Sequence, residues 1–363
     1  MVSSVVYTMY ACIACMYEPG NLQVINLLTC VLNMLRQGGG FSIHSTNVLM
    51  VVENSVVSAC TAGDLGGGFH ISSGNDHLTL HNMTIEDCSS VDDGGGIYVE
   101  TINHYFTLQD SKVLRCETDD KGGGLYFLKS NDHITVVGSS IVGCSAGANG
   151  GGIYISSEND YFSLESSKLI GNSAANNGGG LYTYTFNLFT IIENGVITDC
   201  IANNDGGGIY VYQSSNNFLV KDTVVSGCEA TGSGGFMYIY AYNDYISVVG
   251  VTVSSCKAIE DDGGGIMVLA YNHFFELKSS TFISCWADGR GGGVALSQDN
   301  TNVTVVDSSF TECVSDFYAG GIAAETRNHD MTISNVFFHK CVGSSNGGGI
   351  RIGMVVANHT TLG

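Results

Sequence analysis

The chain has 363 residues, a formal net charge of −21 and only 13% charged residues. Such an acidic excess argues against anionic partners, so we expect no binding to nucleic acid or to anionic membrane surfaces. No run of about 20 apolar residues occurs, so no membrane insertion through a transmembrane helix is expected.

Residues 1–37 precede the first regular repeat and are interpreted as a degenerate leading coil. Met1 to Tyr17 is apolar but has no basic leader region, which disfavours a signal peptide. Neither end of the chain shows a capping helix, and open strand edges invite pairing with another chain. We therefore expect a fragment of a longer protein or a filament subunit, with self-association end to end or side by side.

A glycine triplet then recurs along the chain at an almost constant interval. The triplets start at Gly38, Gly66, Gly94, Gly122, Gly150, Gly178, Gly206, Gly234, Gly263, Gly291, Ala319 and Gly347. The step is 28 residues, apart from one step of 29 between Gly234 and Gly263. A fixed period of this length is typical of stacked repeats. Residues 38–363 are therefore predicted to form one continuous solenoid domain.

Each repeat contains three short apolar groups, which we number from the first residue of its triplet. In the Gly94 repeat these are Ile97 and Val99 at +3 and +5, Phe106 and Leu108 at +12 and +14, and Val113 at +19. Apolar and polar residues alternate with period two, which predicts half-buried strands. One repeat buries too little apolar surface to offset the conformational entropy of ordering it, so the core must continue through the stack.

The predicted fold is therefore all-β: a single-stranded right-handed parallel β-helix of about 12 coils with three short strands per coil. The middle glycine of the triplet is never replaced, whereas Ala319 takes the first place once and Phe236 the third. The middle site is predicted to need a positive φ or to lack room for a Cβ atom, and the outer sites are treated as preferences.

The unit Cys-x5-Gly-Gly-Gly-Ile-Tyr resembles the GGAI-type repeats of polymorphic outer membrane proteins, and more broadly right-handed β-helix proteins of the pectin-lyase-like kind. The coil with Asn172-Ser173-Ala174 before Gly178 is the most similar, because that family has Asn before its glycine motif. Elsewhere this chain has Cys in that place, and Gly where the family has Ala. The resemblance implies the fold; such repeats serve adhesins, passenger domains and surface proteins of other kinds.

Cysteines recur at one place in the repeat, before the bend that leads to the triplet. This column comprises Cys60, Cys88, Cys116, Cys144, Cys200, Cys228, Cys256, Cys285, Cys313 and Cys341, with Asn172 in the missing place. Buried free thiols are the favoured interpretation, since cysteine packs as a small apolar side chain. Disulfides between successive coils are the alternative, because the ~4.8 Å coil spacing lies within the Cα range of a bridge.

Asparagines recur at +9, where stacked amides are predicted to hydrogen-bond along the rod. This column comprises Asn47, Asn75, Asn103, Asn131, Asn159, Asn187, Asn243, Asn272, Asn300 and Asn328. The next position, +10, alternates acids and histidines. Asp132 and Asp160 lie there on adjacent coils, about as far apart as the carboxylates of a retaining glycosidase. Such pairs arise in any acidic β-helix, so no catalytic residue is assigned.

Tyrosines form an unbroken run at +4: Tyr98, Tyr126, Tyr154, Tyr182, Tyr210 and Tyr238. Their neighbours at +3 and +5 point inward, so the tyrosines are predicted to form an aromatic ladder on the surface. Such a ladder either stiffens the sheet by stacking or serves as a contact strip for a glycan or a neighbouring rod.

The bends before the triplets are often acidic, as at Asp92-Asp93 and Glu260-Asp261-Asp262. No fixed calcium motif is present; solvated acidic turns are the default, and bound Ca²⁺ is the alternative. No other cofactor or metal site is expected. Three N-x-S/T sequons mark possible glycosylation at Asn82, Asn302 and Asn358.

The favoured function is a non-catalytic extracellular or cell-surface rod that forms part of a filament, appendage or adhesin, because coil length is uniform and ladders are exposed. The alternatives are a polysaccharide lyase or glycosidase on the same scaffold, and a glycan-binding β-helix that uses the tyrosine strip. Enzymes of this type build a cleft from long irregular loops, and a single extra residue near Ile259-Glu260-Asp261 leaves no obvious room for one.

Overall fold

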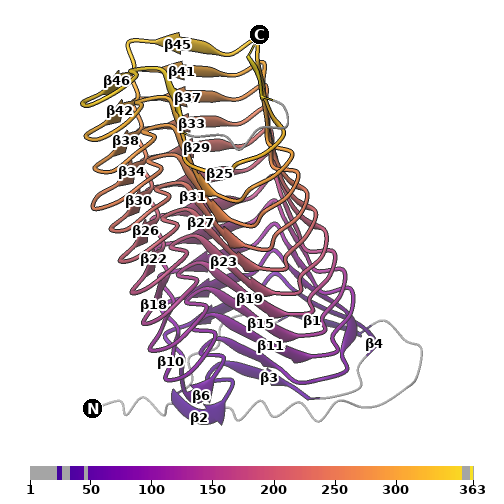
Figure 1. Cartoon of the computed structure of the whole chain (residues 1–363). Helices are drawn as coiled ribbons and strands as arrows, with labels where there is room; N and C mark the ends of the chain where they lie inside the picture. Colours follow the sequence, from indigo (N-terminus) through magenta and orange to yellow (C-terminus); the bar gives the residue numbers. More distant parts are fainter. Residues whose placement is uncertain (1–22, 27–32, 45–47, 354–359, 363) are drawn as a thin grey trace, which may run out of the picture.

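The computed structural model describes residues 23–26, 33–44, 48–353 and 360–362. Over these ranges the strands form four parallel sheets of 13, 12, 12 and 11 strands. Figure 1 shows the coils stacked along one axis, from the indigo N-terminal coils to the yellow C-terminal ones. The predicted parallel β-helix is confirmed. No helix in the described ranges is long and apolar enough to cross a membrane.

One coil is represented by residues 94–121. Its strands are β11 (Ile97–Thr101), β12 (Thr107–Gln109), β13 (Lys112–Leu114) and β14 (Glu117–Thr118). The first three coincide with the predicted apolar groups. The fourth was not predicted, because a strand of two residues is too short to show a period-two pattern.

We number the sheets 1 to 4 in the order in which a coil visits them after its triplet. Sheet 1 runs from β3 (Phe41–Ile43) to β47 (Ile350–Ile352), sheet 2 from β1 (Gln23–Asn26) to β48 (Thr360–Leu362), sheet 3 from β5 (Val56–Ser58) to β45 (Phe337–His339), and sheet 4 from β2 (Asn33–Gln37) to β46 (Val342–Gly343). In sheet 1, Ile153 pairs with Leu181, and Leu181 pairs with Ile209. Equivalent residues therefore stack in one interior file, as predicted.

The region interpreted as a degenerate leading coil adds two of these strands. β1 pairs in parallel with β4 (Val48–Glu53), and β2 pairs in parallel with β6 (Thr61–Leu65). Residues 1–22 and 27–32 lie outside the described ranges.

The core is one continuous apolar cluster that runs through the whole stack. Ile97, Val99, Phe106, Leu108 and Val113 are all fully buried, as the alternation predicted. Burying each such side chain contributes about 1.5–3 kcal/mol. Because the apolar side chains of each coil pack against those of the coils on both sides, the stack is stable where a single repeat would not be.

The glycine triplet lies where sheet 4 passes to sheet 1, and its three places have different requirements. The first glycine has a positive φ, +68° at Gly206. The middle one, Gly207, leaves no room for a side chain, because an added Cβ atom would lie 2.4 Å from Glu229 O and 2.5 Å from Gly235 O. Ala319 takes the first place at φ +54°, so glycine is a preference there, as predicted, although a left-handed conformation is costly for a residue with a Cβ atom.

From Asn75 to Asn328, the asparagine column at +9 is buried at the bend between sheets 1 and 2, and its predicted amide ladder is confirmed there. Asn47 lies outside the described residues. The N–H of Asn131 donates to Oδ1 of Asn159 at 3.0 Å, and the N–H of Asn159 donates to Oδ1 of Asn187 at 2.9 Å. Each amide thus satisfies a buried backbone N–H of the preceding coil, which would otherwise cost free energy.

Candidate functional site

The six tyrosines at +4 form the predicted ladder, but the ladder is not on the surface. Neighbouring rings stack with centroids 4.9–5.1 Å apart. Each tyrosine is only 4–6% exposed. Side chains at +6, among them Leu128, Tyr212 and Tyr240, pack against the ladder. These six residues (Tyr98, Tyr126, Tyr154, Tyr182, Tyr210 and Tyr238) therefore form a second, smaller core outside sheet 1. The predicted stacking of the ladder is confirmed, whereas its expected position on the surface, and with it the contact strip, was wrong.

Burial has an electrostatic consequence along this ladder. Removal from water raises the pKa of Tyr126, Tyr154 and Tyr210 well above the ordinary tyrosine value, and neighbouring carboxylates add to the shift. The phenols thus stay neutral, which fits a packing role.

Most of the exposed aromatic side chains lie instead at +8 and +11, on the bend between sheets 1 and 2. We call this surface the aromatic corner. It comprises Ile102, Tyr105, Tyr161, Phe186, Phe189, Tyr242, Tyr245, Tyr271 and Phe274, all of them exposed. A row of exposed apolar side chains that continues over several coils is more often an interaction surface than a feature that the fold requires.

Rings at +11 stack along the rod axis in two runs. The first run is His77, Tyr105, His133, Tyr161 and Phe189, with centroids 4.5–5.0 Å apart and planes within 6° of parallel. The second run is Tyr245 and Phe274, at 4.6 Å. The stacked rings turn their edges to solvent, since their faces are covered by one another.

The sequence analysis missed this corner, although the signal was present in the recurrence of Tyr or Phe at +11. Residues at +8 and +11 have positive φ, for example +58° at Ile102 and +59° at Tyr105. Two residues in the left-handed region break the period-two pattern at this bend, so alternation along the strands does not give the direction of the side chains at +8 and +11.

The acids at +10 act as hydrogen-bond acceptors of the bend. Oδ1 of Asp132 accepts the N–H of Asp160 at 3.3 Å, and Oδ1 of Asp160 accepts the N–H of Leu188 at 2.9 Å. Oδ1 of Asp76 accepts the N–H of His104 at 3.1 Å in the same way. The alternation of acids with other acceptors at +10 is thus explained by a backbone ladder.

The tyrosine ladder ends at Tyr238, and a polar depression of about 490 Å³ lies beside this end. The next residues at +4 are Met267 and Ala295, which are smaller than tyrosine and leave this space. Asp205 and Asp262 line it. Burial raises the pKa of both carboxyls above the ordinary value.

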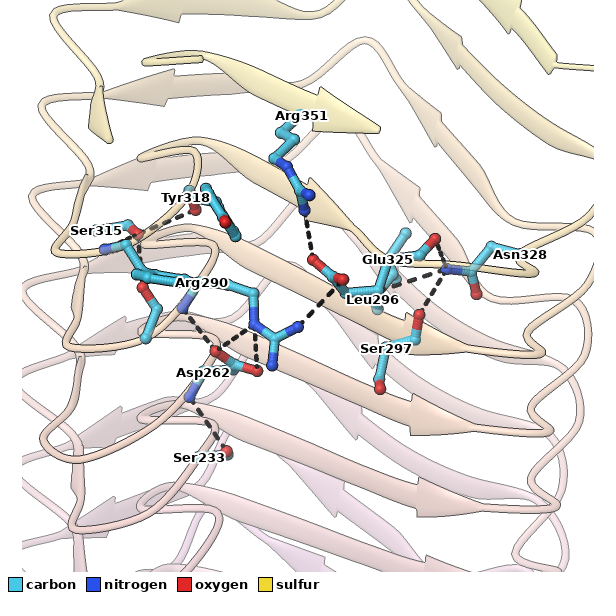
Figure 2. A network of polar contacts seen from close by, with 12 residues as sticks. Ser233, Asp262, Arg290, Leu296, Ser297, Ser315, Tyr318, Glu325, Asn328 and Arg351 are labelled. Carbon is cyan, nitrogen blue, oxygen red and sulfur yellow. Dashed lines mark hydrogen bonds and ion pairs between the residues drawn. The ribbon is translucent and has the colours of Figure 1, made fainter. Parts of the chain in front are cut away.

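Two arginines form ion pairs with Asp262 and Glu325 at this end of the ladder, as Figure 2 shows. Arg290 Nε lies 3.2 Å from Asp262 Oδ2, and Arg290 Nη1 lies 3.2 Å from Glu325 Oε2. Arg351 Nη1 approaches the other oxygen of Glu325 at 2.6 Å. Within the described ranges, no group of three or more His, Cys, Asp or Glu side chains is placed to hold a metal ion.

The family model described as right handed β-helix region matches residues 21–194 and 197–358. The chain belongs to the right-handed β-helix family. No curated protein matches its sequence.

Two solved structures are similar to this right-handed β-helix. The Siphovirus 9NA tailspike receptor binding domain is 12% identical, with a TM-score of 0.41, over 85% of this chain and 52% of the tailspike chain. A mannuronic acid specific polysaccharide family 6 lyase from human gut microbiota is 13% identical, with a TM-score of 0.43, over 94% of this chain and 78% of the lyase chain. The chain thus spans about half the length of the tailspike chain.

The cysteine column of this β-helix consists of free thiols. Nine of its ten members are buried, and Cys341 is partly exposed. Sγ of Cys116 approaches Leu114 O at 3.5 Å and Ile85 O of the preceding coil at 3.8 Å. The adjacent Cys116 thiol, together with burial, raises the pKa of Cys88 to about 12. A thiol that is buried and protonated is a poor nucleophile.

Cys341 is partly exposed, whereas the other nine column thiols are buried, but the neighbouring Cys313 thiol and burial raise the pKa of Cys341 well above the ordinary value. We therefore expect iodoacetamide at pH 7.5 to modify Cys341 slowly and to leave the other nine column thiols of the folded protein unmodified. Denaturation in urea should make all ten react. Mass spectrometry resolved by peptide separates these sites from Cys12, Cys15 and Cys30. Disulfide-linked peptides between column cysteines under non-reducing conditions would contradict the free-thiol column.

Two of the three sequons lie on described bends. Asn82 and Asn302 are both exposed, and the Asn82 amide donates to Asn54 Oδ1 at 2.7 Å. Asn358 lies outside the described residues. Glycosylation at these sites stays a prediction.

Proposed function

We propose that the chain is a non-catalytic extracellular rod of the adhesin type that binds glycans through its aromatic corner. The observation that supports this most is the exposure of aromatic side chains at +11 where the fold does not need them. Asn217, Asn302 and Asp330 occupy the same position with the same positive φ. Asn and Asp adopt this conformation more readily than bulky residues.

The energetic comparison points the same way. A left-handed conformation costs a residue with a Cβ atom about 1–2 kcal/mol, and Asn and Asp offset part of this through local hydrogen bonds. Stacking on the neighbouring ring stabilises an aromatic side chain at +11 by about 0.5–1.5 kcal/mol, which offsets a similar part of this cost. Exposed tyrosine and phenylalanine therefore bring little net stability over asparagine, so a binding role accounts for them better than a folding role.

Glycans suit this surface better than other partners. The net charge of −21 disfavours nucleic acid and anionic lipid. A linear row of aromatic groups is complementary to an extended polymer, because aromatic side chains combine an apolar surface with polar groups at its rim. The half-exposed carboxylates beside the rings at +10, among them Asp132, Asp160 and Asp244, favour a neutral polymer over an anionic one.

A fourfold variant tests the proposal: Tyr105→Asn, Tyr161→Asn, Tyr245→Asn and Phe274→Asn. We expect wild-type protein to bind immobilised neutral polysaccharide and the variant to bind at least about tenfold more weakly. Its melting temperature should stay close to that of wild type, because Asn already occurs at this position. The matched control is Val224→Asn with Ile201→Asn, which removes exposed apolar side chains from other faces.

Two results would overturn the proposal. The first is the absence of polysaccharide binding by wild-type protein, with side-by-side dimers in sedimentation that the fourfold variant abolishes; the corner would then join copies of the chain. The second is release of reducing ends from a polysaccharide in a manner abolished by Asp132→Asn, which would establish the enzymatic alternative.

A further inference from the structure

One coil interrupts the aromatic corner. Between the Gly94 and Gly263 coils, the Gly206 coil is the one that has no ring at +8 or +11; it has Ser214 and Asn217 there. The coils on either side place exposed rings at both positions: Phe186, Phe189, Tyr242 and Tyr245. We call the space over Ser214 and Asn217, between these two pairs of rings, the notch.

The notch exposes ring faces, which the rest of the corner covers. Phe189 stacks on Tyr161 on one side, and Tyr245 stacks on Phe274 on the other. The opposite faces of Phe189 and Tyr245 are both turned toward the Gly206 coil, and no ring of the described residues stacks on them. Phe186 and Tyr242 are 59% and 56% exposed, more than any other ring of the corner.

The spacing suits one guest ring. Coils are ~4.8 Å apart, so Phe189 and Tyr245, two coils apart, are separated by roughly 10 Å. A ring inserted between their outer parts would lie about 5 Å from each. The chain's own rings stack at this distance along the same corner, at 4.5–5.0 Å.

The floor of the notch is polar and uncharged. The backbone N–H groups of Ser214 and Asn217 donate to Tyr242 O at 3.2 Å and to Asp244 O at 3.0 Å. Their side chains have no hydrogen-bond partner among the residues that the structure describes. A hydroxyl and an amide are therefore free to bond a ligand rich in hydroxyl groups, while the walls cover its apolar faces.

We propose that the notch is the principal subsite of the corner and binds one neutral pyranose ring of a glycan. The proposal rests on the proposed function and names where along the corner the strongest contact occurs. Two aromatic faces and an uncharged hydrogen-bonding floor recognise a neutral hexose better than an anionic sugar, which the acidic surface repels.

Filling the notch tests this without removing any ring of the corner. Asn217→Tyr places at this site the side chain that the same position has in neighbouring coils. The matched control is Asn302→Tyr, which makes the same substitution at the same position three coils later. Both variants should keep the circular dichroism and melting temperature of wild type, since tyrosine is native at +11.

The probe is an array of neutral gluco-, manno-, galacto- and N-acetylglucosamine oligosaccharides, with calorimetry on the strongest binder. We expect Asn217→Tyr to weaken binding at least about tenfold and Asn302→Tyr to leave it unchanged. Wild-type binding that Asn217→Tyr does not weaken would overturn the notch and leave the proposed function standing. Binding of a lysine-rich peptide in place of every neutral oligosaccharide would overturn both, since ring faces also attract cations.

Discussion

Gly207→Ala is expected to destabilise the fold by more than about 3 kcal/mol, although it adds a single methyl group. The added Cβ atom would lie 2.4 Å from Glu229 O and 2.5 Å from Gly235 O. Glu229 ends the same coil in sheet 4, and Gly235 opens the next coil. Both atoms belong to the backbone, so no rotamer change relieves the clash and the stacked backbone segments must separate. Urea denaturation, with hydrogen exchange on the amides of residues 206–235, measures the effect.

Gly206→Ala is the matched control, because it adds the same methyl group to the adjacent residue. Its Cβ atom would lie 2.5 Å from Ile209 O, but that atom is only three residues further along the same strand connection and can shift locally. Gly206→Ala should therefore cost less than Gly207→Ala, chiefly the ~1–2 kcal/mol of a left-handed conformation for a residue with a Cβ atom. Ala319 has this residue and this conformation in another coil. Equal urea midpoints for the two variants would contradict the role assigned here to the middle glycine.

Asn159→Ala is expected to destabilise the fold by about 2–3 kcal/mol, because it leaves a buried donor without a partner. Oδ1 of Asn159 accepts both the N–H and the Nδ2 group of Asn131, each at 3.0 Å. Asn159 and Asn131 are fully buried, so water cannot replace the lost bonds. The same urea and hydrogen-exchange measurements apply, with the Asn131 amide as the specific readout.

Two controls define the effect at the asparagine ladder. Asn159→Ser should cost less, since Ser215 occupies the same position in another coil and is buried. Asn82→Ala removes an exposed amide and should change stability by no more than about 0.5 kcal/mol. If Asn159→Ala were as stable as Asn82→Ala, the ladder would not have the structural role given to it.

The coil and its interior were predictable from the sequence. Ile153, Leu181 and Ile209 were expected in one file because a fixed repeat brings equivalent residues into register, and they are paired in the sheet. The asparagine amides and the buried thiols followed from the same reasoning. A column of identical residues can be predicted without knowing the direction of its side chains, since each copy has the same neighbours.

The side on which a column lies was harder to predict. Tyr154 alternates with inward neighbours and does point away from the main core, yet Tyr182 stacks on it and side chains at +6 cover the ladder. Alternation gives the direction of a side chain relative to its own strand. It does not show what the next bend and the adjacent outward residues place above it.

The repeat length, the parallel stacking and the identity of the interior columns were thus determined by the sequence by itself, because periodicity alone requires them. Only the tertiary structure decided that the tyrosines at +4 are buried and that the rings of Tyr105, Tyr161 and Phe189 face solvent. The reason is the backbone at the bend: two positive φ angles turn +8 and +11 outward, and the recurrence of Tyr or Phe at +11 does not by itself reveal such angles.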